Sequence, residues 1–215
     1  MDKQTAIKII GQRLSGRTEA DMSAFITGEM DLTQEGILEG QAFVPWFLSK
    51  VDVLEIGPTA ETLELPAGFL MVDLEEGVFI PMDDGTRAEV VPTDWVSATE
   101  AYGSGAYPME GLPKYYALYG DNQIQFFPKP DADYDVLFAY LKRDVPVSGL
   151  APTGTNLWLT HAPDVFINEV GMACAEVVRD KDAYNLFQNR VQRAWKNLET
   201  KHMERRMAGQ ELYFF

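Results

Sequence analysis

Apolar residues follow a helical period at both ends of the chain and a two-residue period in between. Near the start, apolar side chains three or four positions apart predict a short helix that ends near Gly16. Thr18 followed by Asp21 indicates the capped start of a second helix, although Gly28 weakens its helical pattern. The two apolar stripes consist of Ala6, Ile9, Ile10 and Leu14, and of Met22, Phe25, Ile26, Met30, Ile37 and Leu38.

The middle of the chain has the alternation that is typical of β-strands. Residues 51–56 and 62–65 alternate apolar and polar side chains and predict two strands. Residues 78–82 and 87–91 predict a hairpin, because the turn Asp83-Asp84-Gly85-Thr86 contains an Asp-Gly pair that tolerates the positive φ of a tight turn.

A short helix and a second group of strands follow. The helix is predicted over residues 93–101. Gly120-Asp121-Asn122 then joins residues 113–119 and 123–128 in a second hairpin. Residues 134–141 are predicted to pair with this hairpin as its third strand.

The last quarter of the chain gives the clearest helical pattern. Pro163 suits the first position of one helix, and Asp180-Lys181-Asp182 separates that helix from a second. The whole pattern predicts an α+β fold, in which N-terminal helices and long C-terminal helices pack around a central antiparallel β region. The C-terminal stripes are Phe166, Ile167, Val170, Ala173, Val177 and Val178, then Tyr184, Phe187, Val191, Ala194, Trp195 and Leu198.

The pattern divides the chain into four parts of one structural domain. These are an N-terminal helical segment (1–50), a central β region (51–160), the C-terminal helices (161–207) and a C-terminal tail (208–215). A length of 215 residues fits one domain, taking roughly 150 residues per domain as a soft guide.

The chain is strongly acidic, and its negative charge is unevenly distributed. The formal net charge is -15. Residues 1–160 hold 10 Lys and Arg against 25 Asp and Glu, whereas residues 161–215 hold 8 of each class. Such a surface repels phosphate backbones, so static binding of nucleic acid is disfavoured.

Neither the termini nor the cysteine content indicates export. No secretory signal is recognisable at the start, and no apolar run approaches the roughly 18 residues that a membrane span needs. We therefore expect synthesis and folding in a cytosol and no membrane partner. The single cysteine, Cys174, lies among small apolar residues of a helix and is expected to be an inert core residue.

Motifs for cofactors, metals and catalysis fail at specific positions. Gly103-Ser104-Gly105 begins a dinucleotide-binding pattern, but Pro108 stands where the third glycine belongs. Residues 131–135 are similar to the start of a calcium loop, but Val136 replaces its turn glycine and Lys142 its closing glutamate. No catalytic residue, metal ligand or cofactor is therefore predicted.

Two C-terminal features are harder to explain by core packing alone. Arg190, Arg193, Lys201 and Arg205 fall on one broad face of the last predicted helix, and Arg206 adds to the positive charge. The chain then ends in Leu212, Tyr213, Phe214 and Phe215, which are costly to leave in water. The tail either folds back on its own subunit, inserts into a partner or is a remnant of cloning.

The order of several short motifs resembles the adaptor (head-to-tail connector) proteins of tailed bacteriophages. After two short helices, the resemblance follows Leu65-Pro66-Ala67-Gly68-Phe69-Leu70, Pro113-x-Tyr115, Pro128-x-Pro130-Asp131, Asn156-x-Trp158, Ala162-Pro163-Asp164 and Arg179-Asp180. It covers most of the chain, and it is weakest in the acidic stretch from Glu55 to Glu100.

The resemblance implies a structural subunit of the virion neck rather than an enzyme. Such adaptors commonly form a ring of twelve that joins the portal vertex to nozzle or tail-tube proteins and lets DNA pass without specific binding. In such adaptors a C-terminal extension holds the portal. The resemblance implies the same portal-binding role for Arg205, Arg206, Leu212, Tyr213, Phe214 and Phe215. The alternatives are a tail-associated cell-wall (glycan) hydrolase and a carbohydrate-binding β module.

Overall fold

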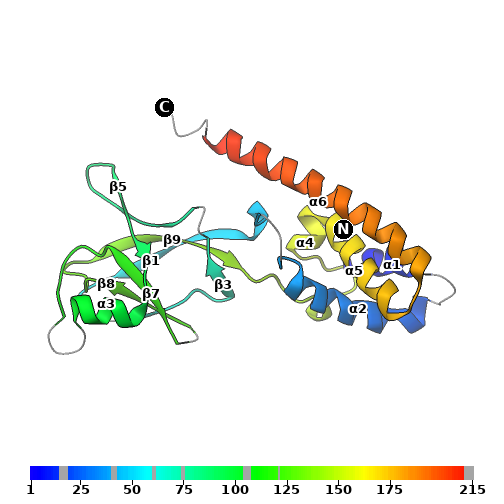
Figure 1. Cartoon of the computed structure of the whole chain (residues 1–215), viewed down its shortest axis with the longest axis horizontal. Helices are drawn as coiled ribbons and strands as arrows, with labels where there is room; N and C mark the ends of the chain where they lie inside the picture. Colours follow the sequence, from blue (N-terminus) through cyan, green and yellow to red (C-terminus); the bar gives the residue numbers. More distant parts are fainter. Residues whose placement is uncertain are drawn as a thin grey trace. The chain divides into compact units, whose positions relative to one another are not determined.

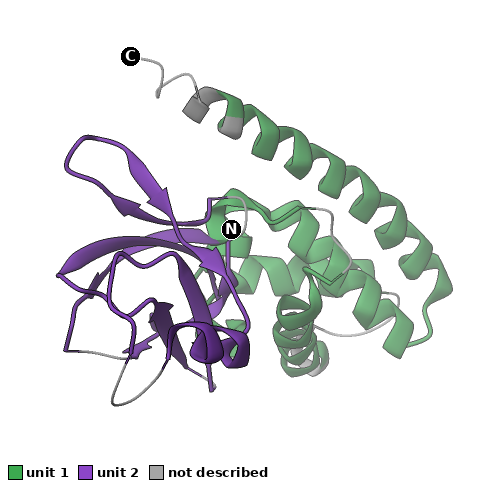
Figure 2. Ribbon diagram, turned by 60° about the vertical axis from the view of Figure 1, so that its left-hand side comes forward, with its two compact units in different colours: residues 1–48, 144–215 green, residues 49–143 purple. Residues whose placement is uncertain are grey.

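The computed structural model describes two compact units built from different parts of the chain. It describes residues 1–14, 19–39, 43–59, 62–73, 76–103, 108–120 and 122–210; the side chains of residues 19–21, 206 and 208–210 are not described. Figure 2 shows the helical unit in green (residues 1–48 and 144–215) and the β unit in purple (residues 49–143). The predicted α+β class is confirmed.

The helical unit is assembled from both ends of the chain. Its helices are α1 (Lys3–Arg13), α2 (Glu19–Gly36), α4 (Leu157–His161), α5 (Pro163–Val177) and α6 (Lys181–Gln210), with 3-10 turns η1 (Trp46–Leu48) and η2 (Val147–Gly149). The two predicted N-terminal helices are confirmed, whereas Gly16 and Thr18, their expected boundary residues, lie outside the described residues. Among the largest fully buried side chains are Trp158, Phe166 and Phe187.

The long helices α5 and α6 form the closest pair in this unit, and their corner lies where the sequence predicts a break. Arg179 adopts a left-handed backbone with a φ of 58°, and Asp180 accepts the backbone N–H of Ala183 at 3.0 Å as a cap for α6. Trp195 Nε1 then donates to Glu169 Oε1 at 2.7 Å across the pair. One residue of the predicted buried stripe is wrong. Val177 is 59% exposed, because the buried face of α5 passes through Cys174 instead.

The β unit contains two sheets (Figure 1). The five-stranded sheet has β9 (Tyr134–Lys142) at its centre, with β1 (Ser49–Ile56) on one edge. The other edge of β9 is shared by β3 (Phe69–Val72) and β4 (Val78–Pro81), and β4 continues to β5 (Arg87–Glu89). The predicted hairpin is confirmed, and Gly85 in its turn has a φ of 81°.

The second sheet has the order β2 (Leu63–Glu64), β8 (Gln123–Phe127), β7 (Tyr115–Tyr119) and β6 (Val91–Pro92). All its pairs are antiparallel except β6 with β7, which is parallel. The helix α3 (Trp95–Tyr102) is capped by the Asp94 carboxylate, which accepts from Ser97 N.

Two sequence-based expectations differ from this arrangement. Residues 134–141 do not pair with the 113–128 hairpin, because β2 occupies the free edge of β8 and β9 pairs along its length with β1. Residues 144–160, expected in the β region, belong to the helical unit, because Trp158 and Leu159 are buried in its core. That the four parts form one structural domain stays a prediction.

The β unit is a continuous insertion whose two ends are neighbours. Ser49, its first residue, is the register partner of Leu141 near its end. Arg143 N donates to Gly68 O at 2.7 Å and fixes the last residue of the unit.

Candidate functional site

The predicted portal-binding residues are described only in part. Leu212, Tyr213, Phe214 and Phe215 lie outside the described residues, as does the side chain of Arg206. Arg205 is exposed near the end of α6, with its guanidinium carbon 4.7 Å from the ring centroid of Trp46. The structure therefore gives Arg205 an intramolecular cation–π contact that the sequence pattern did not reveal.

Aromatic residues before the β unit hold the C-terminal part of α6. His202, expected on a charged helical turn, is 4% exposed. Its ring lies 5.1 Å from that of Phe43 and 6.4 Å from that of Trp46. Trp195 adds an edge contact to Phe43 at 5.9 Å. These contacts fix the helical turn that precedes the tail.

The basic face of α6 is divided between two grooves. Lys201 lines one groove of about 410 Å³ with His161 and Glu204. Arg190 and Arg193 line another of about 250 Å³, and the structure adds Arg13 from the end of α1 to this second group. No sequence pattern pointed to that third arginine, since it is distant along the chain and close only in the fold. A basic groove of this kind favours an anionic ligand.

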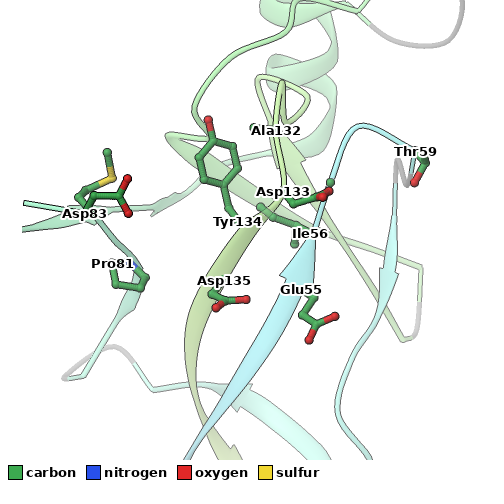
Figure 3. Close-up of a pocket in the computed structure, with 11 residues that line it drawn as sticks. Glu55, Ile56, Thr59, Pro81, Asp83, Ala132, Asp133, Tyr134 and Asp135 are labelled. Atoms are coloured by element: carbon green, nitrogen blue, oxygen red, sulfur yellow. The ribbon is translucent and has the colours of Figure 1, made fainter.

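A third pocket lies in the β unit and is acidic (Figure 3). It has a volume of about 890 Å³ and takes Glu55 from β1, Asp83 from the β4–β5 turn, and Asp133 and Asp135 from the start of β9. Gly57 leaves room for the Asp133 carboxylate, which would have to move if residue 57 carried a Cβ. A pocket lined by carboxylates suits a cationic group.

Catalytic and metal chemistry is not favoured by these side chains. Asp131, the first residue of the calcium-like motif, accepts a hydrogen bond of 2.6 Å from the Tyr134 hydroxyl. In the part of the chain that the structure describes, no group of three or more His, Cys, Asp or Glu side chains is arranged to hold a metal ion. Burial raises the pKa of the Cys174 thiol to about 12, which makes it a poor nucleophile.

Of the helices that the structure describes, none is long and apolar enough to cross a membrane.

The comparison with protein families agrees with the resemblance seen in the sequence. The sequence model of the family described as SU10 adaptor protein matches residues 5–211. A search of curated proteins returned no match. The matched range includes residues of both units, so the family assignment covers nearly the whole sequence.

Proposed function

Because the chain belongs to the SU10 adaptor protein family, whose members are structural phage proteins, we propose that it is a ring subunit joining the portal vertex to the tail. The family match over residues 5–211 is the observation that carries this proposal. The ring, of twelve copies, lies in the virion neck below the portal and contacts nozzle or tail-tube proteins on its other side. Its role is structural, without catalysis.

The charge distribution supports a role in DNA passage. The β unit holds 6 Lys and Arg against 17 Asp and Glu, whereas the helical unit holds 12 against 16. Carboxylates that face a channel repel the phosphate backbone, which keeps the duplex mobile. DNA therefore passes transiently without specific binding.

The end of α6 is the proposed attachment to the portal. Figure 1 shows α6 continuing well past α5 toward residue 210. The contacts of Trp46 with His202 and Arg205 hold the last turns, so the aromatic tail begins from a fixed position. Leu212, Tyr213, Phe214 and Phe215 then act as apolar anchors in a portal pocket, and Arg205 and Arg206 as steering charges.

The test is to mix the purified full-length chain with its portal and examine the product by electron microscopy. A closed ring of twelve copies on one end of the portal is the expected result. Portal particles that stay bare at micromolar chain concentrations would contradict the proposal. A chain without portal serves as the control for self-assembly.

A further inference from the structure

The basic groove of the helical unit has the features of an anion-binding site. Arg13, Arg190 and Arg193 line it together with apolar Ile9 and Ile167. Arg13 is held in place, since its Nη1 donates to Asn168 Oδ1 at 3.4 Å and its guanidinium carbon lies 5.9 Å from the centroid of the Phe187 ring.

Among the described residues that line the groove, three arginines face a single carboxylate, that of Asp164. None of the three forms an ion pair with a described residue; the carboxylate of Asp164 lines the same groove without pairing. Burial lowers the pKa of Arg13, the positive charge of Arg190 lowers it further, and the negative charge of Asp164 opposes this shift without reversing it. Like charges gathered in a groove favour an incoming anion.

A protein carboxylate fits this groove better than a nucleic-acid phosphate. The helical unit has more Asp and Glu than Lys and Arg, so its overall charge opposes a phosphate backbone. A single carboxylate avoids that long-range penalty and suits the planar guanidinium fork of arginine.

The tip of the β4–β5 hairpin presents such a carboxylate. Every residue from Pro81 to Arg87 is exposed, and Met82 is 36% exposed. The turn is ordered internally, since Met82 N donates to Thr86 O at 2.9 Å and Asp84 Oδ1 accepts from Thr86 N at 2.9 Å. Asp83 takes part in no hydrogen bond or ion pair with another described residue, so its carboxylate is available. Figure 1 shows this hairpin, labelled at β5, projecting from its sheet.

We propose that the hairpin tip of one copy inserts into the basic groove of the next copy, with Asp83 between Arg190 and Arg193. Met82 then packs against the half-buried Ile9 in the same groove. The contact joins two different surfaces, so each copy has one tip and one groove to offer, and a succession of such contacts closes into a ring. This contact rests on the proposed ring function and names the surfaces that would build it.

The first test uses cysteine pairs in the full-length chain. Met82→Cys, which keeps the Asp83 carboxylate at the tip, and Asn197→Cys, at an exposed groove position on α6, are combined in one chain and oxidised with and without portal. We expect a ladder of covalent dimers, trimers and larger species. Glu100→Cys with Asn197→Cys is the matched control, because Glu100 is an exposed carboxylate on α3 away from the tip. Cys174 is fully buried and does not interfere.

A second test keeps the inference open to refutation if a cysteine variant misfolds. Asp83→Arg and Arg190→Asp are each expected to weaken ring assembly about tenfold or more, and an equimolar mixture of the two to restore it. Lys196→Asp makes the same charge change on α6 outside the groove and should leave assembly unchanged. Thermal midpoints of all variants check folding.

The outcomes separate this contact from the proposed function. A bond formed only within one chain, or an equal ladder in the Glu100 control, would overturn the contact. Wild-type chain that sediments with portal while the cysteine pair yields no ladder would overturn the contact and leave the proposed function standing. A specific ladder from a chain that does not sediment with portal would support the contact and count against the function.

Discussion

The hydroxyl of Tyr140 in β9 donates a hydrogen bond of 2.8 Å to Oδ2 of Asp52 on the neighbouring strand β1. Lys50, the register partner of Tyr140, reaches the same carboxylate, with Nζ 2.8 Å from Oδ1. The hydrogen bond from Lys50 and then that from Tyr140 lower the pKa of Asp52. The carboxylate therefore ties the long edge strand to the central strand of its sheet.

Asp52→Asn is expected to lower the free energy of unfolding by about 1 kcal/mol at pH 7. The substitution removes the charge from two charge-assisted hydrogen bonds, and the value is kept small because the carboxylate is partly exposed to solvent. The native pKa of Asp52 lies below the ordinary 3.8, so its contribution is complete above 3.8 and is lost as the pH falls below that value. Urea unfolding at pH 7, 5 and 3 should show a smaller difference between the two proteins at pH 3 than at pH 7 and pH 5.

Glu64→Gln, at an exposed position of β2 opposite the neutral Gln123, is the control and should show little change at any of these pH values. A difference between wild type and Asp52→Asn that persists undiminished at pH 3 would contradict the role given to the Asp52 charge.

Gly171→Ala is expected to destabilise the helical unit by about 1–3 kcal/mol, because the new methyl group would lie under 3.0 Å from the Phe187 ring at the α5–α6 contact. Gly28→Ala is its matched partner, since a Cβ there meets nothing within 4 Å. Alanine at this α2 position should stabilise by about 0.5–1 kcal/mol. Urea unfolding of both variants measures the two changes in the free energy of unfolding, which should have opposite signs. Equal changes in the two variants would show that the α5–α6 contact is looser than described.

Arg205→Ala should lower stability by about 0.5–1 kcal/mol through loss of the contact with Trp46. Arg205→Lys keeps the charge and should recover the association rate with portal while recovering only part of the stability. Thermal unfolding and surface-binding kinetics measure the two effects. An association rate that is equal in all three proteins would remove the steering role from this residue.

Deletion of residues 211–215 is expected to abolish binding to the portal and to leave the thermal midpoint of the free chain nearly unchanged. The reason is that apolar anchors contribute only after docking. Co-sedimentation with portal and thermal unfolding test the two halves. A large fall in the midpoint with retained portal binding would show that the tail belongs to the core of its own subunit.

Local chemistry made several elements predictable from the sequence. The corner at Asp180 and the turn around Gly85 depend on capping and on backbone freedom, which are properties of a few adjacent residues. The amphipathic stripes of α5 and α6 were likewise visible, since the helical period places Phe166 and Phe187 on faces that must be buried.

Strand pairing and the basic groove depend on contacts that no local pattern encodes. Alternation fixes which face of β9 is buried but not which strand lies beside it, and the two-residue strand β2 was enough to occupy the edge of β8. Arg13 joins Arg190 and Arg193 only because α1 packs beside α5 and α6. The tail residues were recognised by composition, and their site on the portal stays a prediction.

The pairing of Ser49 with Leu141 has a consequence for the evolution of this chain. The first and last residues of the inserted β unit lie close together. Such a segment can be lengthened, shortened or exchanged with little extra loop-closure entropy in the remaining polypeptide. The β unit can therefore change in length or sequence without requiring the helical unit to change its own chain connections.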